Sequence, residues 1–186
     1  MLRKLSAWLI KISTVWVVVI SLVIFLLFIA IVLPRQTEKI ETQNRGAGSP
    51  DTSLWYSAAD LYEMAEAYGQ NGRDAFVYSH FTFDVAWPLV YTLFLVTSLS
   101  WLSVRAFPLG SQYRAVNLVP LFAALFDFLE NISTSLIMLR YPAGTPFIDM
   151  LAGVFTFIKW FLVAASIILL LLTLVMAIWR RGRFNH

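Results

Sequence analysis

Hydrophobic residues in this chain gather in four long runs, and most of the charged, Gly and Pro residues lie between them. Runs of this length are typical of helices that cross a bilayer. The pattern predicts four transmembrane helices, at about residues 12–33, 80–104, 117–138 and 150–178. We therefore expect an all-α fold, in which residues 1–186 form a single membrane domain built as a four-transmembrane-helix bundle.

The first run follows three basic residues and is followed by Pro34, which is expected to end the span. A signal peptide shares this layout, but its hydrophobic core is usually about 7–15 residues long and a small-residue cleavage site follows it. No A-x-A cleavage signature lies shortly after Leu33. The sequence therefore favours an uncleaved membrane anchor.

The segment between the first two runs, residues 35–79, is expected to form a long outer loop. Its first part, residues 35–50, is polar and contains Gly and Pro, which indicates a flexible connector. A helix is predicted next, with a capping box of Ser57 and Asp60 and an end at Gly69. Its apolar face is formed by Leu61, Met64, Ala65 and Tyr68. We expect this extracytoplasmic amphipathic helix to lie on the bilayer surface or to cap the bundle.

The distribution of basic residues predicts the orientation of the chain. Eight Lys and Arg residues lie at the two termini and in the loop between the second and third runs, and five lie on the opposite side. Most of those five belong to the long loop, where seven acidic residues accompany them. The positive-inside rule therefore places both termini in the cytoplasm, in a multi-pass protein of a bacterial-type plasma membrane. The net charge of +3 is explained by this pattern, and no nucleic-acid partner is expected.

Composition narrows the range of functions. Hydrophobic residues make up 59% of the chain and charged residues 13%, well below the roughly 25% of soluble domains. The chain is cysteine-free, which excludes disulfides, thiol redox chemistry and Cys metal ligands. His80 and His186 are too far apart in the sequence to form a recognisable metal motif, so neither a metal nor a cofactor is expected.

Polar residues inside the hydrophobic runs are the best candidates for a site. An ionisable side chain near the bilayer centre costs about 2.5–3.5 kcal/mol, so it normally faces the interior of a bundle and finds a partner. Helical spacing gives each of the last three spans a polar stripe between the midplane and the outer boundary. We expect these stripes to form an intramembrane polar cluster of Asp84, Tyr91, Asp127, Glu130, Asn131 and Lys159.

This cluster has a structural and a functional interpretation. In the structural one, Lys159 pairs with Glu130 or Asp127, Asp84 bonds to Tyr91 or a backbone amide, and the contacts only determine how the helices pack. However, three carboxylates face one lysine. Either an arginine reaches in from the outer rim, or one carboxyl group retains a proton and serves proton transfer or acid/base chemistry.

The outer rim provides a second set of candidates. Arginine side chains there are solvated loop charges, or they line an opening above the cluster and hold a lipid phosphate or an anionic ligand. The candidate rim residues are Arg73, Arg140 and Tyr141.

Three functions remain open from the sequence. The preferred one is a non-enzymatic membrane protein that binds a lipid, a small apolar ligand or a partner subunit through its outer half. One alternative is a proton-coupled transporter or channel component, which would need to form a homo-oligomer because four helices are few. The other is an intramembrane lipid-modifying enzyme that uses Asp127 or Glu130 as acid or base. Membrane lipids are expected partners in each case. Four spans with a long first loop are too common a plan to indicate a function.

Overall fold

The computed structural model describes residues 1–44 and 46–183, and all regular structure in these ranges is helical. Arg45, one of the basic residues counted above, and residues 184–186 lie outside this part. Within it, four helical segments are long and apolar enough to cross a membrane: Val15–Ile40, Ala58–Ala106, Gln112–Arg140 and Ile148–Gly182. The prediction of an all-helical chain with four candidate spans is confirmed.

The described residues form two compact units, and each is described by itself. Unit 1 comprises Met1–Leu26, Val90–Ala123 and the chain from Phe161 onward, and unit 2 comprises Leu27–Leu89 and Ala124–Trp160. Four helices contribute residues to both units. In chain order the elements are α1 (Leu2–Ile12), α2 (Val15–Leu27), the π-helix η1 (Phe28–Val32), α3 (Leu33–Gln43), the 3-10 helix η2 (Pro50–Thr52), α4 (Ala58–His80), α5 (Phe83–Ala106), the 3-10 helix η3 (Gln112–Leu118), α6 (Val119–Arg140) and α7 (Ile148–Arg183).

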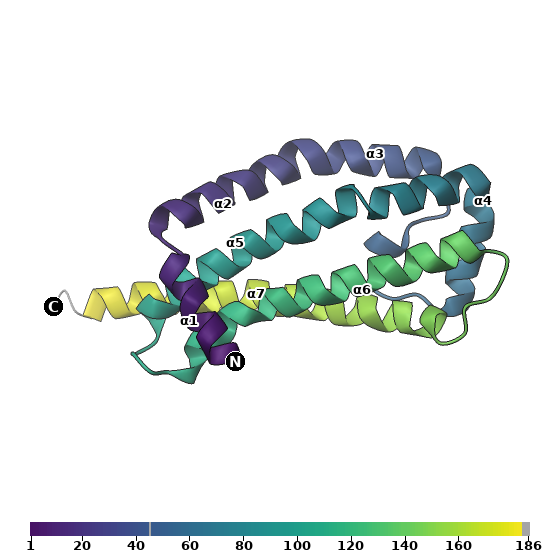
Figure 1. Ribbon diagram of the computed structural model, residues 1–186. Coiled ribbons are helices and arrows are strands. Elements are labelled where there is room, and N and C mark those ends of the chain that lie inside the picture. Colours follow the sequence, from purple (N-terminus) through teal and green to yellow (C-terminus); the bar gives the residue numbers. More distant parts are fainter. Residues whose placement is uncertain (45, 184–186) are drawn as a thin grey trace. The chain divides into compact units, whose positions relative to one another are not determined.

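A buried amide joins three elements of unit 1. Asn117 of η3 donates to the backbone oxygen of Ser6 at 3.2 Å and to Ser100 Oγ at 2.9 Å, and it accepts from Ser6 Oγ at 2.7 Å. Asn117 has no exposed surface, and α1 lies against η3 in Figure 1. Because an unpaired buried amide is costly, these bonds hold α1 and α5 against η3.

Pro34 does not end the first long helix, contrary to the prediction. The chain stays helical from α2 through η1 into α3. Pro34 lies in the first turn of α3, directly after the wider turns of the π-helix. Proline is tolerated in a first turn, and a π-turn supplies the altered hydrogen bonding that its missing N–H requires. Residues 35–43 are therefore helical, although the sequence indicated a flexible connector. In unit 2, α3 lies beside α4 (Figure 1).

The start of α4 and the interruption at Gly69 both agree with the sequence. Asp60 Oδ2 accepts from the backbone N–H of Ser57 at 2.8 Å, and Ser57 Oγ accepts from the N–H of Asp60 at 3.2 Å, which completes the capping box. Gly69 adopts φ 64° and ψ 179°, and this conformation breaks the helix. Residues 70–80 form a second helical piece beyond the break.

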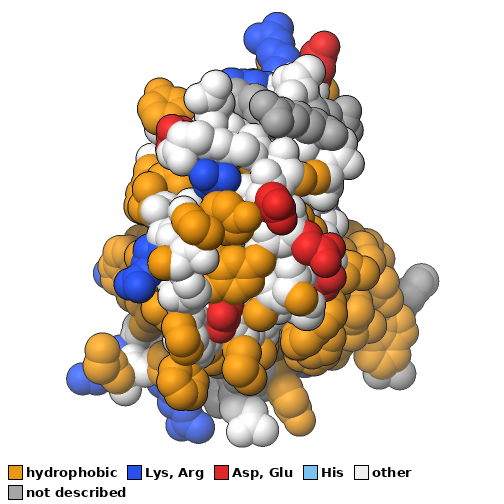
Figure 2. All heavy atoms as spheres, turned by 90° about the vertical axis from the view of Figure 1, so that its right-hand side faces the viewer, with side chains coloured by type: hydrophobic (Ala, Val, Ile, Leu, Met, Phe, Trp, Pro, Cys, Tyr) orange, Lys and Arg blue, Asp and Glu red, His pale blue; other side chains and the backbone are white. Residues whose placement is uncertain are grey.

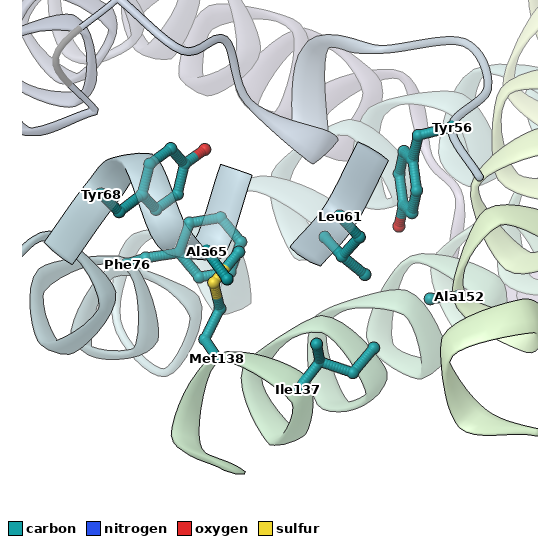
Figure 3. Packing of buried hydrophobic residues seen from close by; sticks show 8 residues of the cluster. All are labelled: Tyr56, Leu61, Ala65, Tyr68, Phe76, Ile137, Met138 and Ala152. Atoms are coloured by element: carbon teal, nitrogen blue, oxygen red, sulfur yellow. The ribbon is translucent and has the colours of Figure 1, made fainter. Parts of the chain in front are cut away.

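The apolar face of α4 packs as its spacing predicted. Leu61, Ala65 and Tyr68 are buried against Ile137 and Met138 of α6, as Figure 3 shows. Burial of such a face supplies most of the stability of a helix of this kind, because intrinsic helix propensity alone is weak. Helix α4 is thus attached to the rest of unit 2 by a hydrophobic cluster that also includes Tyr56, Phe76 and Ala152.

Candidate functional site

A buried ion pair joins α6 to α7 in unit 2. The ammonium of Lys159 contacts Glu130 Oε2, and the Glu130 side chain has no exposed surface. The hydroxyl of Thr156, less than one helical turn before Lys159, donates to Glu130 Oε1 at 2.5 Å. Both charged groups lie inside candidate spans. The pair therefore supplies the compensation that each buried charge needs.

Tyr56 connects this ion pair to the segment that precedes α4. Its hydroxyl donates to Glu130 Oε1 at 3.4 Å and lies 2.9 Å from Thr156 Oγ1. Burial raises the pKa of Tyr56, and the negative charge of Glu130 raises it further, so the phenol stays neutral. A neutral phenol keeps the proton with which it contacts the carboxylate.

Two contacts from α7 hold the segment around Tyr56 in place. The indole N–H of Trp160 donates to the backbone oxygen of Ser53 at 3.0 Å. A Cβ atom at Gly153 would lie 2.4 Å from the backbone oxygen of Tyr56. Only glycine permits this close approach of the helix to the segment, so Gly153 positions the Tyr56 side chain above Glu130.

A second polar group in unit 2 is centred on His80, at the end of α4. Its Nε2 lies 3.1 Å from Asp51 Oδ1, and its Nδ1 lies 3.4 Å from Asp84 Oδ2 and 2.9 Å from the backbone oxygen of Phe76. A carbonyl oxygen can only accept, so Nδ1 carries a proton. Because the atoms that face both ring nitrogens are oxygen acceptors, the site suits a positively charged imidazolium.

The electrostatics of Asp51 link the two polar groups. Burial alone raises the pKa of this carboxyl, but the charge and the hydrogen bond of His80 outweigh burial and lower the pKa to about 2. The charge of Lys159 contributes to this lowered pKa, and Asp51 in turn raises the pKa of Tyr56. Asp51 is therefore ionised at neutral pH, and the charges of the two groups influence each other.

The remaining residues of the predicted cluster are placed as follows. Asp84 accepts from Ser79 Oγ at 3.2 Å, and its backbone oxygen accepts from Asn131 Nδ2 at 2.9 Å, so Asn131 lies beside the His80 group. Asp127 is buried in unit 2, whereas Tyr91 is buried in unit 1.

The predicted rim residues differ in burial and in their contacts. Arg73 is buried, and its guanidinium donates to the backbone oxygen of Ala65 at 2.8 Å and to Gln70 Oε1 at 2.9 Å. The same guanidinium lies 4.7 Å from the ring centre of Tyr141. Arg140 is exposed at the end of α6. Arg73 thus bridges the break at Gly69 in α4.

A pocket of about 430 Å³ opens beside Tyr56. Trp55, more than half exposed, forms one wall and makes an edge contact with Phe157 of α7, at 6.3 Å between ring centres. Figure 2 shows acidic side chains gathered around hydrophobic ones on one face of the molecule. The pocket combines both kinds of side chain, and its lining residues are Ala47, Ser53, Trp55, Tyr56, Asp60, Glu63, Met64 and Ala67.

The structure adds residues that sequence reasoning did not select. Tyr56 and Thr156 complete the surroundings of Glu130, and Asp51 and His80 form the second group. One sequence signal could have found His80: it precedes Asp84 by four residues, so helical spacing places the two side chains near each other. Asp51 and Tyr56 lie in a segment outside the apolar runs, and no spacing rule connects them to α6 or α7.

Asp51, His80 and Asp84 offer ligand atoms within 4.8 Å of one another, a set that can hold a divalent cation. The two carboxylates, however, face different nitrogens of the same ring. A metal binds one ring nitrogen, so both carboxylates could reach one ion only after rearrangement. As described, the group forms an ion-pair network.

The chemistry available in unit 2 is thus a set of buried carboxylates, an imidazole, an ammonium and a neutral phenol, beside a surface pocket. These groups can exchange protons or hold a wall of the pocket rigid. Nothing in the comparisons adds a further assignment. The chain matches no protein-family model, and comparison with curated proteins and with solved structures found no match.

Proposed function

We propose that this chain is a non-enzymatic integral membrane protein whose unit 2 binds a small amphiphile, either a lipid or an apolar small molecule, in the pocket beside Tyr56. The observation that carries the proposal is the double role of Tyr56, which lines the pocket and contacts the buried carboxylate of Glu130. A partner membrane subunit that inserts an apolar side chain would use the same surface.

The membrane location is supported by hydropathy and burial together. The first candidate span has a mean hydropathy of 3.3 with 6% of its window buried, and the fourth has 3.0 with 17% buried. Helices this apolar that bury so little of their surface need an apolar solvent. We propose that both termini are cytoplasmic and that the pocket lies on the opposite side, because of the distribution of basic residues.

The binding role is supported by the rigidity of the pocket wall. Tyr56 is held by Glu130 and Thr156, and its backbone rests on Gly153. A wall that is already in place avoids the cost of ordering on binding. Trp55 and Met64 offer apolar contact, and Asp60 and Glu63 offer acceptors to a polar head. This combination suits an amphiphile.

A pocket-filling substitution tests the binding role. Ala67→Trp places an indole in the pocket, and Ala59→Trp, on the exposed surface of the same helix, is the matched control. We expect wild-type protein purified in mild detergent to retain an amphiphile that native mass spectrometry detects. Ala67→Trp should lose it and Ala59→Trp should keep it. An unchanged ligand complement in Ala67→Trp would contradict the proposal.

The topology has its own test, because the chain contains no cysteine. A single cysteine in place of exposed Thr42 should react with a membrane-impermeant maleimide in intact cells. A single cysteine in place of exposed Gln112 should react only after permeabilisation. The reverse labelling pattern would overturn the proposed orientation.

Proton transfer is a second candidate function, and the His80 group favours it. An imidazole with a carboxylate beside each ring nitrogen can accept a proton at one nitrogen and release one at the other. His80→Gln should then abolish dissipation of a pH gradient in proteoliposomes, while Ala67→Trp should leave it intact. Equal flux through His80→Gln and wild type would exclude this function.

A further inference from the structure

Unit 1 contains a second pocket, of about 640 Å³, that is lined by arginine and apolar side chains. Its arginines are Arg105, Arg114, Arg180 and Arg181, which come from α5, η3 and α7. The lining includes no acidic residue. Four like charges that share one concave surface repel each other, and a bound anion relieves that repulsion.

Hydrogen bonds to backbone oxygens hold three of these guanidinium groups in position around the end of α5. Arg114 donates from Nε and Nη2 to the oxygen of Phe107, at 3.3 and 3.0 Å. Arg180 Nη1 donates to the oxygen of Ala106 at 3.0 Å, and Arg105 Nη1 donates to the oxygen of Trp101 at 2.7 Å. The bonds to Ala106 and Phe107 satisfy carbonyl groups at the end of α5, and the bond to Trp101 fixes Arg105 along the same helix.

The same bonds leave guanidinium donors for a ligand. Each guanidinium carries five N–H donors, and the bonds of Arg105 and Arg180 each use one nitrogen. The bonds to backbone oxygens therefore fix the positions of these guanidinium groups. The remaining N–H donors can still bind two oxygens of an anion. Arginine in a fixed orientation is the side chain best suited to phosphate, because its planar fork matches two phosphate oxygens.

The apolar part of the lining indicates where such a phosphate comes from. Trp101, Leu102, Leu174 and Ile178 line the same pocket. A free phosphate gains nothing from apolar walls, whereas a phospholipid places its glycerol and acyl chains against them. Basic pockets between membrane helices on the cytoplasmic side bind anionic headgroups in this way. The proposed orientation places the end of α5 on that side.

We propose that this arginine pocket binds a phosphate group, and that the headgroup of an anionic phospholipid supplies it. The inference rests on the proposed membrane location but is independent of the pocket in unit 2. The net charge of the lipid distinguishes the proposed ligand from other lipids, because an uncharged or zwitterionic lipid cannot neutralise four arginines.

The test is thermal unfolding of the full chain in neutral detergent micelles, followed by tryptophan fluorescence. Phosphatidylglycerol, phosphatidylcholine and inorganic phosphate are added at equal phosphate concentration. We expect phosphatidylglycerol to raise the unfolding temperature and the other two to leave it nearly unchanged. Equal stabilisation by inorganic phosphate would overturn the lipid source, and equal stabilisation by phosphatidylcholine would overturn the phosphate site. If the cysteine test shows membrane insertion but phosphatidylglycerol stabilises the protein no more than the other two compounds, only this inference is wrong.

Substitutions then localise the effect. Arg105→Gln combined with Arg180→Gln should weaken phosphatidylglycerol binding at least roughly tenfold, since each removes a charge-assisted hydrogen bond. Arg3→Gln, an exposed arginine of α1 outside the pocket, is the control for lost charge and should bind like wild type. An equal loss in Arg3→Gln would show unspecific attraction and overturn the site. If the double variant does not fold, exposed Arg181→Gln provides the same comparison.

Discussion

Lys159 forms an ion pair with Glu130 in a place where the glutamate side chain has no exposed surface. Glu130 belongs to α6 and Lys159 to α7, and Tyr56 from the segment before α4 also contacts the carboxylate. One carboxylate thus joins three parts of unit 2. Removal of either charge leaves the other buried without its partner, which is the costly situation in a protein interior.

Glu130→Gln should therefore lower the free energy of unfolding by about 3–5 kcal/mol, because Lys159 keeps its charge and loses its partner. Denaturant unfolding in detergent micelles, followed by tryptophan fluorescence, measures this loss. The double variant Glu130→Gln/Lys159→Met should regain much of it, since no buried charge remains. Equal stability of Glu130→Gln and wild type would show that the pair contributes nothing to folding.

Gly153→Ala should destabilise the protein, although Gly to Ala in a helix usually adds about 1 kcal/mol of stability. The added Cβ would lie 2.4 Å from the backbone oxygen of Tyr56, too close for either helix or segment to stay in place. Gly182→Ala is the matched control, because nothing lies within 4 Å of its Cβ position. A comparison of the two unfolding midpoints tests this, and equal gains in both variants would contradict the close approach.

Stability should fall when the solution is acidified through the range in which Asp51 titrates. The folded pKa is about 2, below the ordinary value of 3.8, so the contribution of Asp51 is fully present above pH 4 and is lost as pH falls toward 2. The full contribution is about 2 kcal/mol. The free energy of unfolding of Asp51→Asn should fall less between pH 5 and pH 2.5 than that of wild type. Identical pH profiles for the two proteins would remove Asp51 from this role.

Ser57→Ala should weaken the start of α4 by about 1 kcal/mol, because the hydroxyl accepts from the N–H of Asp60. Ser57→Gly should cost only a few tenths of that amount, since glycine is a tolerated N-cap. Hydrogen exchange at the amide of Asp60 reports the difference directly. Equal exchange rates in wild type and Ser57→Ala would mean that the capping box does not stabilise the helix.

Most helical elements could be predicted from the sequence, and the main error, the span end predicted at Pro34, has a local cause. Long apolar runs predict spans because a bilayer requires them, and the structure has four such helices in its described part. The prediction that Pro34 ends the span was wrong: proline usually stops a helix, but the preceding π-turn accommodates it here. Gly69 does interrupt the helix, as its position predicted, and a second helical piece follows it.

Only part of the candidate site could be predicted from the sequence. Glu130, Lys159 and Asp84 stood out because charges in apolar runs are costly and therefore informative. Asp51 and Tyr56 lie outside these runs, and their contacts join residues far apart in the chain, such as Asp51 with His80 and Tyr56 with Glu130. No periodicity encodes such contacts. The predicted convergence of all six cluster residues stays a prediction.

The breaks in the second candidate span determine which part of it a bilayer can match. Taken as one rod, its 49 residues would extend about 70 Å, more than twice the roughly 30 Å of a hydrocarbon layer. Gly69 and the turn at Phe81 divide that length, and the last piece, α5 with 24 residues, extends about 36 Å. In the proposed membrane location, a change in bilayer thickness would therefore act on α5, and the turn at Phe81 separates α4 from that effect.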